Sequence, residues 1–155
     1  LDVKWSSAST DDQGTDPNHD KDVGNCTAKI TTENETNDKL VITISNAYPC
    51  YECTVTGKVD NIGDIPVKLY KATLKFGDQE EIIYDAKAGI NNLSKQIDLG
   101  SPPVINVNLT RDSDQIDPGG STNYYLWIHV KQAAKEDETY KFELVLQFAQ
   151  WNEVP

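Results

Sequence analysis

The sequence predicts an all-β protein built as an antiparallel β-sandwich, and three observations carry this prediction. Apolar and polar residues alternate with a period of two along several short runs, whereas a sustained period of 3.6 is absent. Turn-forming residues separate the runs, as in residues 117–120, which read Asp-Pro-Gly-Gly. Many one-faced strands divided by glycine and proline turns are typical of a sandwich whose apolar faces pack together.

The runs expected as strands follow one another from residue 40 to residue 148. Their apolar stripes are, in chain order, Leu40/Ile42/Ile44, Cys53/Val55/Gly57/Val59, Ile65/Val67/Leu69 continued by Tyr70/Ala72/Leu74/Phe76, Ile105/Val107/Leu109, Tyr124/Leu126/Ile128/Val130 and Tyr140/Phe142/Leu144/Leu146/Phe148. Between Leu69 and Tyr70 the stripe changes phase by one residue, which indicates a β-bulge. The 155 residues are enough to bury one core of this kind, and they contain no internal repeat.

The N-terminal residues follow a different pattern. Leu1, Val3 and Trp5 alternate with polar residues, which predicts a short strand with one apolar face. In residues 6–24 only Ala8 and Val23 are apolar, and this stretch could span about 60 Å when fully extended. An apolar strand on a long polar leash is the arrangement needed to add a strand to the sheet of a neighbouring molecule.

We therefore divide the chain into two parts. Residues 1–24 form a donor strand with its acidic leash, and residues 25–155 form the sandwich domain. The alternative is that residues 1–5 pair within their own sandwich or fray.

The charge of the chain bears on its partners. Lys and Arg number 14 against 25 Asp and Glu, which gives a formal net charge of −11. Such a field repels phosphate backbones, so we expect no nucleic-acid partner. No run of 18 apolar residues occurs, so we expect no membrane insertion. The chain starts at Leu1 without a leader, as expected of an exported protein after removal of its signal peptide, or of a shortened chain.

Three cysteines indicate one disulfide and one further thiol. Cys50 and Cys53 have the spacing of a redox motif, but a proline precedes the first and a β-rich run follows the second. The catalytic motif requires a helix N-terminus at this point, so we expect a structural bridge from Cys26 to Cys50 or Cys53. Four Asn-X-Ser/Thr sequons, at Asn25, Asn34, Asn92 and Asn108, are candidate glycosylation sites on an exported chain.

The sequence lacks the common signatures of catalysis. It has no His-Glu-X-X-His helix, no Gly-X-Ser-X-Gly elbow and no phosphate-binding glycine loop, so we expect no enzymatic activity. The acidic residues Asp11, Asp12, Asp16 and Asp20 are weak candidate ligands for Ca²⁺, although they lack the order of an EF-hand. Tyr125 and Trp127, on the outward face of a predicted strand, could instead form a platform for sugars.

Two segments resemble a known family. The first reads LVITISNAYPC over residues 40–50 and CTVTGKVDNIGDIPVKL over residues 53–69. The second contains DPGG at 117–120, YYLWIHV at 124–130 and YKFELVLQFAQWN at 140–152. Together they resemble the TasA and camelysin group of secreted β-sandwich proteins, and most closely its archaeal members, which include bundling-pilus subunits.

The resemblance implies an exported jelly-roll sandwich. Fibre-forming members of the group polymerise by donor-strand exchange, and the matching position here is Leu1, Val3 and Trp5 with their leash. We therefore expect the structural subunit of an extracellular, cell-surface filament that forms a helical homopolymer, with lateral bundling and a role in biofilm matrix or cell–cell adhesion. The alternative is a monomeric secreted module that binds glycans or calcium.

Overall fold

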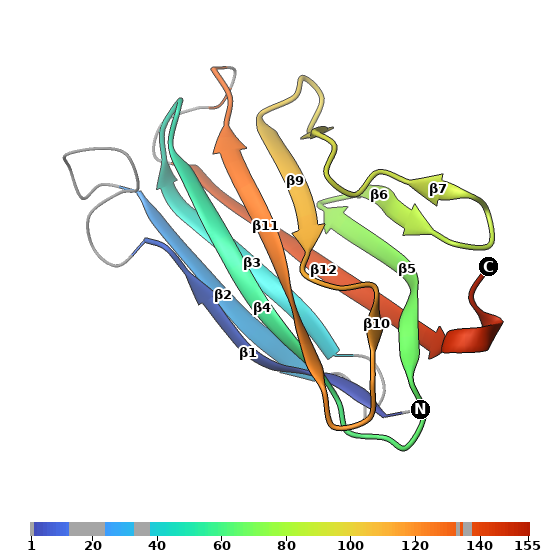
Figure 1. Cartoon of the computed structure of the whole chain (residues 1–155). Coiled ribbons are helices and arrows are strands. Elements are labelled where there is room, and N and C mark those ends of the chain that lie inside the picture. Colours follow the sequence, from blue (N-terminus) through green and yellow to red (C-terminus); the bar gives the residue numbers. More distant parts are fainter. Residues whose placement is uncertain (1, 13–23, 33–37, 133, 135–137) are drawn as a thin grey trace.

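The chain folds into two antiparallel sheets that pack face to face, as seen in a computed structural model (Figure 1). The structure describes residues 2–12, 24–32, 38–132, 134 and 138–155. Its twelve strands and one short 3₁₀ helix, Trp151–Glu153, make an antiparallel β-sandwich of the described residues and confirm the predicted fold class. Among these residues no helix has the length and apolar character needed to cross a membrane.

The first sheet has five strands. In spatial order they are β1 (Val3–Thr10), β4 (Glu52–Asn61), β11 (Ser121–Val130), β9 (Ile105–Arg111) and β8 (Ile97–Leu99). Strand β1 is therefore an edge strand, and its ladder partner is β4.

The second sheet has seven strands. Their spatial order is β2 (Asn25–Thr32), β3 (Asp38–Ala47), β12 (Glu138–Gln150), β5 (Val67–Phe76), β6 (Gln79–Asp85) and β7 (Ile90–Asn91), and β10 (Gln115–Ile116) pairs with one end of β5. The edge strands β1 and β2 lie side by side along the same margin of the sandwich (Figure 1).

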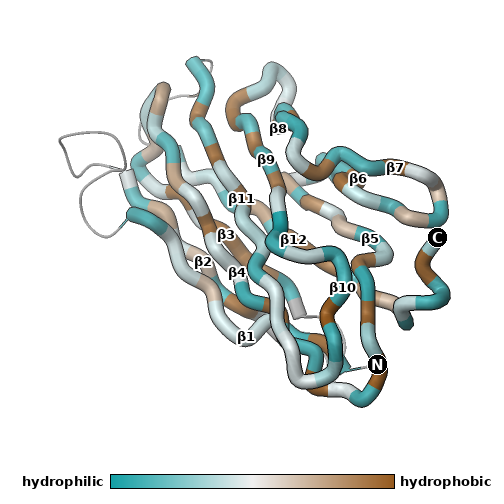
Figure 2. The backbone as a smooth tube through the Cα atoms, in the orientation of Figure 1, coloured by the Kyte–Doolittle hydropathy of each residue, from teal (hydrophilic) through white to brown (hydrophobic). Residues whose placement is uncertain are grey.

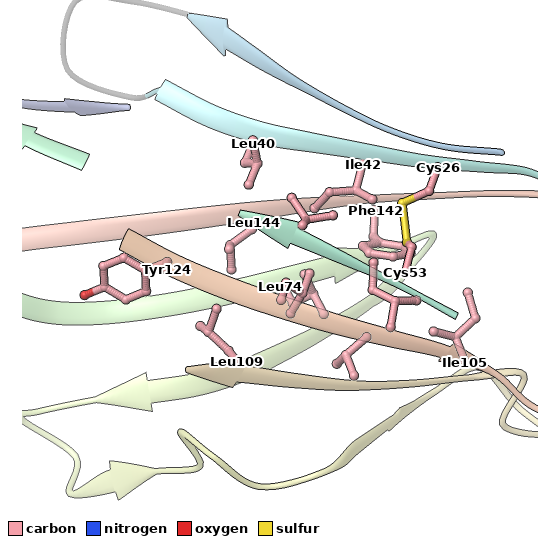
Figure 3. Packing of buried hydrophobic residues seen from close by; sticks show 14 of the residues in the cluster. Cys26, Leu40, Ile42, Cys53, Leu74, Ile105, Leu109, Tyr124, Phe142 and Leu144 are labelled. Carbon is pink, nitrogen blue, oxygen red and sulfur yellow. A yellow bond between two sulfur atoms is a disulfide. The ribbon is translucent and has the colours of Figure 1, made fainter. Parts of the chain in front are cut away.

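The core lies between the sheets, where the predicted apolar stripes meet. Along β11 burial alternates without a break, because Tyr124, Leu126, Ile128 and Val130 point inward and the residues between them point to solvent. Figure 2 shows the same alternation as changing hydropathy along the strands. Phe142 and Leu144 of β12 face the inner residues of the other sheet (Figure 3).

The bulge predicted at the phase change is present in β5. Lys71 pairs with Gln147 and Leu69 pairs with Phe148, so Tyr70 is the extra residue on β5. The extra residue restores the alternation, and Leu69, Ala72 and Leu74 are all fully buried.

The N-terminal strand is longer than the sequence predicts. Its apolar alternation ends at Trp5, yet β1 continues to Thr10 after a register shift between Trp5 and Ser7. Small polar residues carry no periodic signal, and the strand persists because its backbone pairs with β4 as far as Val55. In this single chain β1 completes its own sheet, so pairing with a second chain stays a prediction.

Candidate functional site

Trp5 is the most buried residue that the structure describes on β1, and it marks the candidate site. Its side chain is 6% exposed although it belongs to an edge strand. The indole ring packs edge-on against Tyr124 of β11, with ring centroids 6.3 Å apart and planes at 73°. On the other side it lies against Gly57 of β4. We call the space between Gly57 and Tyr124 the Trp5 pocket.

Gly57 makes this pocket possible. A Cβ atom built on Gly57 would lie 2.3 Å from Cζ3 of Trp5, which is closer than any real carbon contact. Glycine inside a strand normally costs stability, and it is kept where another group approaches the backbone closely. The sequence placed Gly57 on the inward stripe of its strand, but only the structure shows that the missing side chain is replaced by the Trp5 ring.

The beginning of β1 rests on the turn that follows β4. The backbone N–H of Ile62 donates to the carbonyl oxygen of Asp2 at 2.9 Å. Within that turn the buried Asn61 side chain donates to the carbonyl oxygens of Ile65 and Ile116, at 2.8 and 2.9 Å, and accepts a bond from the N–H of Gly63. The turn at residues 61–63, which reads Asn-Ile-Gly, therefore shapes the surface against which the N-terminus of β1 docks.

A disulfide holds the neighbours of β1 together. Cys26 of β2 is bonded to Cys53 of β4, which confirms one of the two predicted pairings (Figure 3). The bridge crosses between the two sheets along the margin at which β1 lies. Near it, the Thr10 hydroxyl at the end of β1 donates to the carbonyl oxygen of Cys26 at 2.9 Å. Cys50 is exposed, and its sulfur accepts a hydrogen bond from Gln132.

The electrostatics of the Trp5 pocket centre on Tyr124. Burial raises the pKa of Tyr124 to about 12, and the nearby guanidinium of Arg111 offsets only part of this rise. The hydroxyl oxygen has no hydrogen-bond partner of acceptable geometry among the described residues, so the loss of water is only partly compensated. Tyr124 is therefore neutral at physiological pH and acts as an apolar wall of the pocket.

The acidic residues predicted as weak calcium ligands are divided by the structure. Asp11 extends the β1–β4 pairing, because its N–H donates to the carbonyl oxygen of Thr54 and its carboxylate accepts from the N–H of Thr54 at 2.8 Å. The Asp12 carboxylate accepts a bond from the Tyr51 hydroxyl. Asp16 and Asp20 lie outside the described residues, within which no group of three metal-binding side chains occurs.

Some of the candidate donor and glycosylation residues lie within the described part of the chain and others lie outside it. Val3 is partly buried beside Trp5 on β1, and Leu1 lies outside the described residues. Among the sequons, Asn25 is exposed at the start of β2, Asn92 is partly exposed after β7, and Asn108 lies on the outward face of β9. Asn34 is outside the described part of the chain.

The outward face of the five-stranded sheet carries a second surface feature. A shallow depression of about 350 Å³ lies beside Trp127 and His129 of β11, with Asn106 of β9 and Lys131 on its wall. The sequence predicts Trp127 and Tyr125 to face outward, and both are partly exposed there. The depression itself was not foreseeable, because its wall also includes loop residues such as Gln96, far away in sequence.

Comparisons of the chain with protein-family models, curated protein sequences and solved structures gave no significant match.

Proposed function

We propose that this protein is the structural subunit of an extracellular filament and that it polymerises head-to-tail by donating β1 to the next subunit. The observation that carries the proposal is the Trp5 side chain, which belongs to a terminal edge strand and fills a pocket opened by the absence of a side chain at Gly57. A Trp5 side chain from a second chain could fill the Trp5 pocket in the same way as the side chain of the same chain does.

Exchange of β1 preserves the contacts of the single chain. In the filament the strand would make the same ladder with β4, from Val3 opposite Asn61 to Thr10 opposite Val55, on a neighbouring subunit. Burying the Val3 and Trp5 side chains contributes on the order of 4 kcal/mol before ladder bonds are counted. The residues that link Thr10 to Gly24 have a maximum reach of about 45 Å by chain geometry, which allows the strand to leave its own sheet.

The disulfide supports the acceptor side of this contact. When β1 departs, the two strands beside the vacated position, β4 and β2, stay joined through Cys53 and Cys26. A groove with covalently connected walls is preorganised, so less ordering is needed when the next strand enters. The same bond is compatible with an oxidising, extracellular environment.

Head-to-tail exchange produces a filament because donor and acceptor surfaces differ. Each subunit offers β1 and receives another β1 at β4, and such a heterologous contact continues without closing. A jelly-roll strand path, lateral bundling and a place in biofilm matrix or cell–cell adhesion complete the proposal. Absence of enzymatic activity and of a cofactor stays part of this proposal.

Negative-stain electron microscopy of the full chain beside a variant lacking residues 1–6 tests the proposal. We expect filaments from the full chain and discrete particles from the shortened one. Trp5→Ala should reduce filaments strongly, whereas the control Lys4→Ala should polymerise normally, because Lys4 is exposed on the same strand. Filaments that persist without residues 1–6 would exclude insertion of Val3 and Trp5 as the donor contact.

A peptide experiment separates loss of donation from loss of folding. A synthetic peptide of residues 1–12 should bind the shortened protein and raise its melting temperature, because it restores the missing Val3 and Trp5 contacts beside β4. The same peptide carrying Trp5→Ala should bind at least tenfold more weakly. Discrete particles from both proteins, with no binding of the peptide, would favour the monomeric glycan- or calcium-binding module instead.

A further inference from the structure

We propose that the depression beside Trp127, on the outward face of the five-stranded sheet, is a binding site for a neutral saccharide. It is formed by β11 and β9 with nearby loop residues, on the opposite side of the sheet from the Trp5 pocket. The proposal is independent of strand donation, because the outward residues of β11 alternate with those that face the core.

The aromatic wall of the depression is held in place by stacking. The Trp127 indole and the His129 imidazole lie nearly parallel, with ring centroids 5.6 Å apart and planes at 12°. Both side chains come from the outward face of one strand, where alternation spaces them two residues apart. A partly exposed, oriented indole presents a flat apolar surface that matches the C–H face of a pyranose ring.

The polar wall supplies both hydrogen-bond donors and acceptors. Asn106 is 9% exposed although it points outward, and its Nδ2 donates to Oδ1 of Asp98 at 2.8 Å. Lys131 Nζ contacts the same Asp98 oxygen at 3.1 Å. These bonds hold the pKa of Asp98 below its usual value, so that the carboxylate is charged. They also orient the Asn106 amide, whose carbonyl oxygen remains as an acceptor.

This combination favours a sugar over other ligands. Sugar hydroxyls both donate and accept hydrogen bonds, and a wall of amide groups with the Lys131 ammonium meets both requirements. An anionic ligand would meet a chain with a net charge of −11, and the Lys131 charge is paired with Asp98. A purely apolar ligand would cover the Asn106 carbonyl oxygen without donating a hydrogen bond to it. The volume of about 350 Å³ is at the small end of ligand sites, which suits one or two hexose units.

The saccharide has two conceivable sources. Asn108, a glycosylation sequon, lies directly opposite Trp127 in the β9–β11 ladder, and its Oδ1 is buried without a hydrogen-bond partner. Side chains opposite each other in such a ladder are neighbours, so an N-glycan on Asn108 would begin beside the indole. The other source is a separate oligosaccharide from a cell surface or matrix.

Binding measurements on protein produced without glycosylation test the proposal. The probe is an immobilised array of gluco-, manno- and galacto-oligosaccharides, followed by calorimetric titration of the best ligand. We expect saturable binding that Trp127→Ala weakens at least tenfold. Tyr125→Ala is the matched control, because Tyr125 lies on the same face of β11 but outside the depression, and its affinity should change less than twofold. Circular dichroism and thermal unfolding will establish that both variants are folded.

Absence of binding to every probe, or equal losses in the two folded variants, would overturn the proposal. A glycosylated preparation distinguishes the two sources. If the Asn108 glycan occupies the site, this preparation should bind no added saccharide until Asn108→Gln removes the attachment point. If the ligand is a separate saccharide, both preparations should bind it with affinities within about twofold of each other. Because none of these variants alters β1, the filament assay should be unaffected.

Discussion

The two edge strands at one margin of the sandwich, β1 and β2, are similar in form and differ in how they are held. Each has eight residues, each pairs with a single neighbour, and they lie side by side across the two sheets. Strand β2 is bonded covalently to β4 through Cys26 and Cys53, whereas the described contacts of β1 are all non-covalent. The margin therefore combines a covalently fixed strand with a strand whose described contacts are non-covalent, as the proposed exchange requires.

The difference indicates how little of the buried core depends on β1. Most of the buried side chains come from the inner strands β3, β4, β5, β9, β11 and β12. Strand β1 adds one large side chain, Trp5, to that core. Loss of β1 would expose one pocket and one ladder edge, while the disulfide keeps the remaining strands in place.

Of the changes that test this difference between β1 and β2, removal of the disulfide should lower the free energy of unfolding most. For the double variant Cys26→Ala/Cys53→Ala we expect the free energy of unfolding to fall by about 3 kcal/mol, because a loop spanning 27 residues is no longer closed in the unfolded chain. Denaturant titration measures the loss, and hydrogen exchange should show β2 amides losing protection toward the level of β1. Cys50→Ala is the control, with an expected change below about 0.5 kcal/mol because the residue is exposed. A loss below 1 kcal/mol in the double variant would mean that non-covalent packing alone fixes β2.

Adding a side chain at Gly57, inside the Trp5 pocket, should have the next largest effect on the free energy of unfolding. Gly57→Ala should lower the free energy of unfolding by about 2 kcal/mol, because the new methyl group overlaps the Trp5 ring. In a Trp5→Ala background the same change should cost almost nothing, since the overlapping ring is gone. A double-mutant cycle from denaturant titrations measures this coupling, and additive losses would show that Gly57 is required for another reason.

Alkaline pH should have a smaller effect on the free energy of unfolding. Its size also depends on whether Trp5 of β1 covers Tyr124. Tyr124 ionises near pH 12 in the folded chain and near 10 when unfolded, so its contribution is fully present below pH 10 and is lost between pH 10 and 12. By pH 11 this loss should reach about 1.4 kcal/mol relative to Tyr124→Phe, which lacks the ionisable group. The difference between the two proteins, measured by denaturant titration at pH 9 and pH 11, isolates Tyr124 from other titrating groups. Without residues 1–6 the difference should shrink, because the departure of Trp5 opens the pocket to water.

Strands with strict alternation and large apolar residues were predictable from the sequence. Strand β11 has the inward residues expected. In β5, an inner strand of the seven-stranded sheet, the phase change located the bulge at Tyr70. Strands β2 and β6 were missed for physical reasons. In β2 the inward positions hold small or modest side chains such as Ala28, and in β6 two glutamates adjoin two isoleucines and mask the alternation.

The candidate site was predictable only in part. Alternation at Val3 and Trp5 identified an unusual strand, and cysteine spacing restricted the bridge to two pairings. The pairing of Cys26 with Cys53, the fit of Trp5 against Gly57 and the packing of Tyr124 depend on residues more than fifty positions apart in the chain or on opposite sheets. Local sequence patterns contain no information about contacts between residues that are far apart in the chain.

By itself the sequence determined which residues of the strictly alternating strands face inward, since a period of two places successive residues on opposite faces. It also determined where several strands end, because turn segments such as Asp-Pro-Gly-Gly at residues 117–120 interrupt the ladder. The tertiary structure alone decided which strands are neighbours, which cysteine is bridged and which side chain fills the space above Gly57. These outcomes depend on long-range packing between sheets, where the same apolar stripe can meet several partners and only close fit selects one.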